Sequence, residues 1–148
     1  MKTLPRGHRE PRIALGTLAI MVGCLVNFLG NKILGIRVEL FYGLDTFNFF
    51  WFLAIFILPA IVGIVVSYIF GFGGKWLALF PPLIVLSISY FEAVYLIDVP
   101  VGAQIMPMAW WGFFVFLAIE CSAAGGVMGE IFFKAYDKED AEQARKQM

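Results

Sequence analysis

Charged residues are scarce in the middle of this chain, although both of its ends carry many. Only 15% of the 148 residues are charged, whereas a soluble domain typically has about 25%. Residues 1–12 and 130–148 hold most of these charges, and the 117 residues between them hold eight. We therefore expect no second, water-soluble domain within these residues, and the net charge of zero gives no indication of a nucleic-acid partner.

Histidine and cysteine are also nearly absent. The one histidine, His8, precedes the apolar part of the chain, and Cys24 and Cys121 lie far apart within apolar segments. These residues cannot supply the clustered ligands of a zinc, haem or iron–sulfur centre. They also leave no serine or cysteine nucleophile with a histidine base. We therefore expect no cofactor, no bound metal and no enzymatic activity.

Long apolar runs fill most of the sequence, in which 61% of the residues are hydrophobic. A membrane-spanning helix needs about 20 predominantly apolar residues. Four segments meet this requirement, namely 13–33, 47–70, 76–97 and 109–133. The sequence therefore predicts an all-α integral membrane protein, with one membrane domain over residues 1–148 and four transmembrane helices in a bundle.

The distribution of lysine and arginine predicts the orientation of these spans. Nine of them lie in the tails or between the second and third spans: Lys2, Arg6, Arg9, Arg12, Lys75, Lys134, Lys138, Arg145 and Lys146. The other connections hold only Lys32 and Arg37. Because cytoplasmic loops are enriched in these residues, we expect both tails, 1–12 and 134–148, in the cytoplasm. The expected location is the bacterial cytoplasmic (inner) membrane.

The connection between the first two spans, residues 34–46, carries apolar residues at helical spacing. Ile36, Leu40 and Leu44 share one side, which predicts an amphipathic helix lying in the outer membrane interface. Asp45 is then expected to cap the second span. A charged helix is expected to continue out of the fourth span, with Glu130 and Lys134 as an i,i+4 pair.

Prolines mark irregular points in two other spans. Pro59 lies at the centre of the second span and frees the carbonyl of Ile55, which predicts a kink. Pro81 and Pro82 predict that a helix begins there, after an irregular turn over 71–75.

Small residues form two stripes on which another helix can pack closely. In the first span, glycine recurs every seven residues at Gly16, Gly23 and Gly30 and forms one stripe. Asn27 lies within this stripe, where its side chain can form a hydrogen bond with a neighbouring helix. The fourth span has five small residues within an arc of about 100°, including a GxxxG pair. These five are Ala118, Cys121, Ser122, Gly125 and Gly129.

Glu120 lies near the middle of the fourth span and points about 150° away from this small-residue arc. A carboxylate at the centre of a bilayer costs roughly 2.5–3.5 kcal/mol, so this side should also meet protein or a wet cavity. A four-helix bundle can cover both the small-residue arc and the Glu120 side only if the fourth span is at its centre. Otherwise a partner must cover one of these two sides. Glu92, in the outer half of the third span, is expected to reach the interface or to pair with Lys32 or Arg37.

Two functions of different classes remain open from the sequence. The first is a structural or accessory subunit of a larger inner-membrane complex, whose partners are the lipid bilayer and other membrane-protein subunits. The second is a small homo-oligomeric channel or proton-coupled transporter, with Glu120, Glu92 and Asn27 as candidate intramembrane functional residues. Inverted-repeat transporters have matching halves, whereas 13–70 and 76–133 share no evident pattern, which favours the first.

Overall fold

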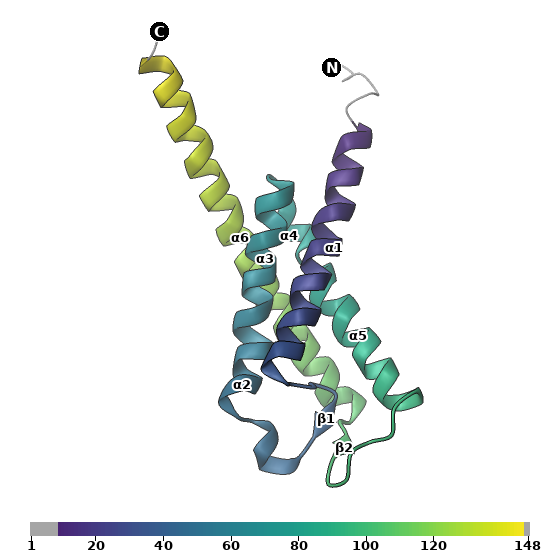
Figure 1. Cartoon of the computed structure of the whole chain (residues 1–148). Helices are drawn as coiled ribbons and strands as arrows, with labels where there is room; N and C mark the ends of the chain where they lie inside the picture. Colours follow the sequence, from purple (N-terminus) through teal and green to yellow (C-terminus); the bar gives the residue numbers. More distant parts are fainter. Residues whose placement is uncertain (1–8, 147–148) are drawn as a thin grey trace.

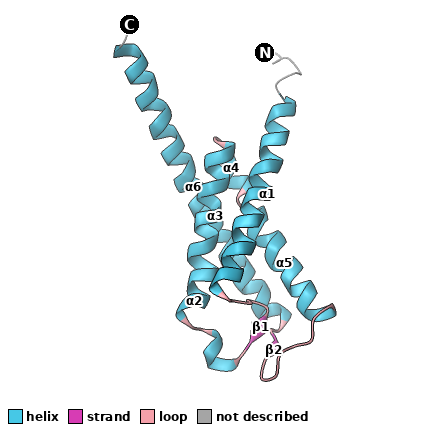
Figure 2. Cartoon of the chain, in the orientation of Figure 1, coloured by secondary structure: helices cyan, strands magenta, loops and turns pink. Residues whose placement is uncertain are grey.

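The computed structural model describes residues 9–146, which are mostly helical (Figures 1 and 2). The four longest helices are α1 (Arg9–Leu34), α3 (Leu58–Phe70), α5 (Phe80–Tyr95) and α6 (Met108–Lys146). Lys2, Arg6 and His8 of the N-terminal tail lie outside the described residues. Figure 1 shows both described ends of the chain at one end of the bundle, here called the terminal end; the opposite end is the cap end.

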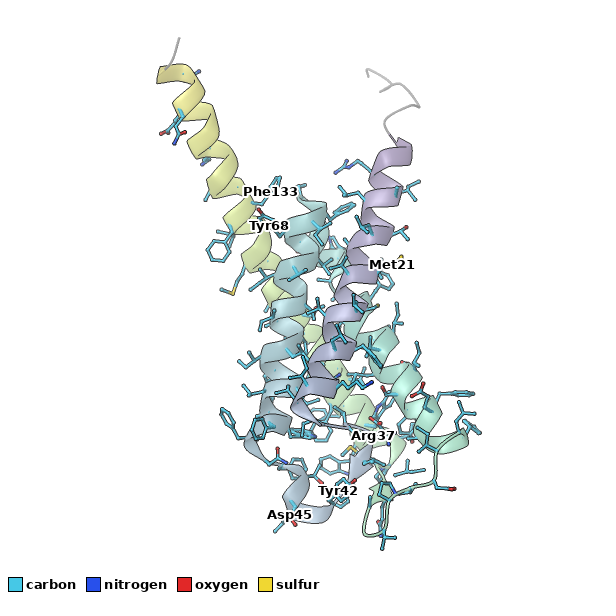
Figure 3. All side chains as sticks on the ribbon, in the orientation of Figure 1. Met21, Arg37, Tyr42, Asp45, Tyr68 and Phe133 are labelled. Atoms are coloured by element: carbon cyan, nitrogen blue, oxygen red, sulfur yellow. The ribbon has the colours of Figure 1, made fainter. Side chains whose placement is uncertain are left out.

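Four helical stretches are long and apolar enough to cross a membrane, and this confirms the four apolar helices expected from the sequence. They are Arg12–Leu34, Phe49–Phe70, Gly74–Tyr95 and Met108–Ala135. Large apolar side chains cover the outside of the bundle, as the sticks of Figure 3 show, and Ile33 for example is 84% exposed. A continuous apolar exterior is what a helix bundle presents to lipid rather than to water.

The second span is built from three pieces that follow one another without a break. These are α2 (Phe49–Phe52), the π-helix η3 (Leu53–Ile57) and α3. Within η3 the Leu58 N–H donates to the carbonyl of Leu53, five residues earlier. Pro59 comes directly after and has no N–H to give to the carbonyl of Ile55. The structure thus places a change of helical hydrogen bonding beside Pro59, where the sequence predicts a kink.

α3 lies at the centre of the bundle and packs against α6 on one side and α1 on the other. Its contact with α6 is a contact of backbones. A Cβ atom at Gly63 would overlap the carbonyl oxygen of Ser122, and one at Gly125 would overlap the carbonyl oxygen of Ala60. α6 contacts α4, α5 and η3 as well as α3.

α1 packs through its glycine stripe and leaves most of its circumference exposed. A Cβ atom at Gly23 would lie 2.7 Å from both Pro81 Cγ and Val66 Cγ2, and one at Gly30 would overlap Leu58. The stripe thus faces α3 and the start of α5. The helix ends at Leu34 because Gly35, with φ of +66°, takes the left-handed conformation that terminates helices.

The cap end differs from the expectation of an interfacial helix over residues 34–46. The structure has a short strand there, β1 (Leu40–Phe41), followed by a 3₁₀ turn, η2 (Gly43–Thr46). β1 pairs antiparallel with β2 (Gln104–Ile105), with Leu40 opposite Ile105. Gly35 and Gly43 both have positive φ and break any helix, and the pairing with β2 replaces the helical hydrogen bonds.

Two local predictions meet different outcomes. α5 has Pro81 and Pro82 in its first turn, after the one-turn helix α4 (Gly74–Leu77), as the prolines predict. The predicted cap at Asp45 is wrong: Asn48 caps α2, and its Oδ1 accepts the N–H of Trp51 at 2.9 Å. Asn48 takes this role because η2 turns the chain through Thr46, so that helical geometry begins only at residue 49.

The α3–α6 contact predicts an asymmetry between two glycines of α6. Gly125→Ala should destabilise the protein by about 1–3 kcal/mol or more, because the new methyl group meets a carbonyl oxygen of α3 and the backbones must separate. Gly112→Ala is the matched control, since a Cβ atom there meets nothing within 4 Å. Thermal unfolding in detergent, followed by size-exclusion chromatography, measures both. Equal stability of the two variants would show that α3 and α6 are not in backbone contact.

Candidate functional site

Glu120 lies on the part of α6 that forms the fourth candidate span and is exposed at the surface of the bundle. It comes 12 residues after Met108 and 15 residues before Ala135, the limits of that span. At about 1.5 Å per residue it is roughly 18 Å from one limit and 22 Å from the other. The carboxyl group is therefore at mid-depth and points away from the bundle.

Five apolar residues on the same side of α6 are exposed together with Glu120. At intervals of three or four residues they make one stripe along the helix, here called the Glu120 stripe. Its members are Phe113, Phe116, Glu120, Ala124, Val127 and Ile131. The phenylalanines lie toward the cap end of the stripe, while Ala124 and Val127 make its other half smaller and smoother. A single ionisable group is thus set in an otherwise apolar face.

The opposite face of α6 is the one that the bundle uses. Ala118, Ser122, Gly125 and Gly129 are buried there. The Ser122 hydroxyl donates to the carbonyl of Ala78, at the end of α4, with an oxygen–oxygen distance of 2.6 Å. Cys121, at the edge of this face, is half-buried. Because the small residues turn inward, the Glu120 stripe turns outward.

A hollow of about 240 Å³ opens beside the Glu120 stripe, one to two turns from Glu120 toward the terminal end. It is lined by Lys75, Trp76 and Leu79 of the α4 region and by Ala123 and Val127 of α6. The Lys75 ammonium lies 5.9 Å from the centre of the Trp76 ring, and no ion pair joins it to Glu120 among the described residues. The stripe therefore has a recess next to it that a side chain from outside can enter.

The three residues that the sequence singles out as functional candidates lie on three different helices. Glu92 is half-buried in the last turn of α5 and makes no ion pair within the described part of the chain. Asn27 is buried in α1, at 1% exposure, and its Oδ1 accepts the side-chain N–H of Asn31 at 3.1 Å. The structure does not bring Glu120, Glu92 and Asn27 together.

Two polar arrangements were missed by sequence reasoning. Arg37 Nε lies 2.8 Å from Glu39 Oε1, and the pair joins a buried carboxylate, 3% exposed for Glu39, to an Arg37 side chain that is 36% exposed. Arg37 therefore does not pair with Glu92. The signal was the spacing of two residues between opposite charges, but the helix expected over 34–46 would have pointed them apart.

Glu130 is the second missed arrangement. Its Oε1 accepts the backbone N–H groups of Gly73 and Lys75, at 2.9 and 3.1 Å. It thereby ties the turn between α3 and α4 to α6. The expected pair with Lys134 is not formed, because Lys134 lies over the ring of Phe72 at 5.0 Å while Glu130 turns toward the backbone. Nothing in the sequence links a carboxylate to N–H groups 55 and 57 residues away.

The cap end holds a cavity with a volume of about 370 Å³. It is bounded by the β1–β2 ribbon and the start of α6: Phe41, Phe47, Gln104, Ile105, Met106, Pro107, Trp110 and Phe114. Trp51 packs edge-on against Phe47 and Phe114, at centroid distances of 5.1 and 4.7 Å. The lining contains no charged group.

The Glu130 contacts predict that an amide can replace the carboxylate but a methyl group cannot. Glu130→Gln keeps an oxygen for both N–H groups, whereas Glu130→Ala leaves them without that acceptor and should cost about 1–3 kcal/mol. Hydrogen exchange of the Gly73 and Lys75 amides should accelerate in Glu130→Ala alone. Glu142→Ala, on the exposed helical extension, serves as the control and should leave that exchange unchanged.

Comparison with known proteins gives no match to a family model, to a curated protein or to a solved structure.

Proposed function

We propose that this protein is a structural or accessory subunit of a larger complex in the bacterial cytoplasmic membrane, with both termini in the cytoplasm. The observation that carries the proposal is the exposed carboxyl group of Glu120 at mid-span, set in an apolar stripe. Such a group facing lipid costs roughly 2.5–3.5 kcal/mol even on the most lenient scale. A helix of another chain that covers the stripe removes this cost.

The bundle itself offers no cover for Glu120. α3 occupies the central position, so α6 has one face in the bundle and the other outside. Every lysine and arginine side chain that the structure describes lies toward one of the two ends. Arg12, Lys75, Lys134, Lys138 and Arg145 lie toward the terminal end, and Lys32 and Arg37 toward the cap end. Lys75 lines the hollow together with Ala123, close to Glu120, but no ion pair joins Lys75 to Glu120 among the described residues.

A different chain fits the stripe better than a second copy of this one. Two copies packed in parallel on the stripe would place one Glu120 against the other and bring no cation to that depth. A partner helix with a basic, hydroxyl or amide side chain at mid-depth would supply the missing donor. Ala124 lets such a helix approach closely, and the hollow beside Val127 accepts one of its side chains.

The proposed orientation is supported by the charges at the two ends of the bundle. Seven of the nine lysines and arginines within residues 9–146 belong to the terminal end, which is the excess expected on the cytoplasmic side. Trp110 and Trp111 stand in the first turn of α6 at the cap end, where amphipathic rings favour the opposite interface.

The proposed binding of a partner to the Glu120 stripe can be tested by adding a bulky side chain to the stripe. Ala124→Trp should remove subunits that copurify with the parent in mild detergent, because the exposed ring blocks close approach without disturbing the bundle. Met21→Trp adds the same bulk to an exposed site on α1 and should retain them. Mass spectrometry of the purified complexes compares the two. Identical subunits from both variants, or a parent that purifies alone, contradict the proposal.

The same preparations distinguish the alternative, a homo-oligomeric channel or proton-coupled transporter that uses Glu120. Glu120→Gln keeps the shape and hydrogen-bonding capacity of the side chain but removes its titratable proton. In a subunit, assembly should survive this change, and neither parent nor variant should conduct ions in liposomes. A single-species oligomer whose proton flux disappears in Glu120→Gln would instead establish the transporter.

The topology gives a separate prediction. A reporter fused after Met148 or placed before Met1 should be active only as a cytoplasmic reporter, and one inserted at Gly102 only as a periplasmic reporter. Gly102 suits the insertion because it has a positive φ in an exposed turn with nothing near its Cβ position. A periplasmic signal from either terminus contradicts the proposed orientation.

A further inference from the structure

A wide groove runs along α1 at the terminal end, on the side of the bundle where α1 meets α4 and the start of α5. Its volume is about 640 Å³. The lining comes from four helices: Arg12, Ile13, Gly16, Thr17, Ile20, Phe70, Leu77 and Phe80. The groove is open to the surroundings of the bundle and separate from the Glu120 stripe.

The depth of the groove depends on Gly16. A Cβ atom at this position would lie 3.1 Å from Leu77 Cδ2 and 3.3 Å from Phe70 Cε2, so any side chain there would fill its floor. The walls offer no free polar group, because the Thr17 hydroxyl donates to the carbonyl of Ile13 within α1, at 3.0 Å. The groove therefore suits an apolar chain.

The rim of the groove carries a cation. Arg12 is exposed, and its guanidinium carbon lies 5.9 Å from the centre of the Phe70 ring. Arg12 is also the first residue of the first candidate span, which places it at the level of the lipid headgroups. From there to Ile20 the groove follows α1 for about 12 Å toward the apolar layer.

We propose that this groove binds one acidic phospholipid, with an acyl chain between Ile13, Gly16 and Phe80 and with its net negatively charged headgroup on the Arg12 guanidinium. An acidic phospholipid consists of an anionic headgroup and apolar acyl chains. Arg12 at headgroup level matches the first part, and the apolar groove beside it matches the second. Basic residues between transmembrane helices select acidic headgroups in this way. The cavity at the cap end has no charged lining, so it lacks this selectivity.

The cation at the rim can be tested with two variants on one helix. Purified protein is mixed with phosphatidylglycerol or with phosphatidylcholine of the same acyl chains, and bound lipid is counted by native mass spectrometry. The parent should retain phosphatidylglycerol at least several-fold better. Arg12→Gln should abolish this preference. Lys32→Gln should keep it, because Lys32 also lies over a ring, that of Phe28 at 5.8 Å, but at the other end of α1.

The apolar part of the groove is tested by filling it with a larger side chain. Thr17→Trp should reduce binding of both lipids. Leu18→Trp should not, because Leu18 is exposed at the next position but lies outside the groove. Thermal unfolding confirms that each variant is folded. The proposal is overturned if the parent protein shows no preference for phosphatidylglycerol, or if Arg12→Gln keeps that preference. Ala124→Trp should still bind the lipid. This variant therefore distinguishes a failure of the lipid site from a failure of the proposed partner contact at the Glu120 stripe.

Discussion

α3 and α6 lie so close together that each needs a glycine where the other's backbone passes. Gly63 makes room for the Ser122 carbonyl, and Gly125 makes room for the Ala60 carbonyl. Between apolar helices in lipid, close packing of this kind replaces the hydrophobic effect as the source of association. The Ser122 hydroxyl adds a hydrogen bond to Ala78 on the same side. The rotation of α6 about its own axis is thereby set, since no other face of this helix is as smooth.

The direction of Glu120 follows from that rotation. With the small residues turned inward, the carboxyl group has to face outward, together with the phenylalanines and aliphatic residues of the Glu120 stripe. Inside the bundle, Asn27 Oδ1 accepts the side-chain N–H of Asn31, although Asn27 Nδ2 and Asn31 Oδ1 have no partner. Glu120 has no such neighbour on its own helix face. The same packing that holds α6 against α3 therefore leaves the Glu120 carboxyl group without an ion pair among the described residues.

The spans and the faces of α6 could be predicted from the sequence, because each depends on residues close together in the chain. An apolar run of sufficient length predicts a span, and the helical period alone sets Glu120 apart from Gly125. The cap could not be predicted in this way. β1 pairs with β2 more than 60 residues later, and the left-handed Gly35 redirects the chain before any amphipathic helix can form. Glu130 was missed for the same reason, since its partners are backbone N–H groups on a distant turn.

The unbroken course of α6 beyond the bundle has a mechanical consequence. The helix continues from Ala135 to Lys146 as one rod with the fourth span. Gly125 and Gly129 hold the rod against α3, and Glu130 holds it against the α3–α4 turn. Glu130 and Lys146 are 16 residues apart, a distance of about 24 Å along the axis. A tilt of about 10° beyond Glu130 would carry the far tip sideways by about 4 Å, given that lever length. The length of helix beyond Glu130 thus sets how far a given tilt displaces the charged tip.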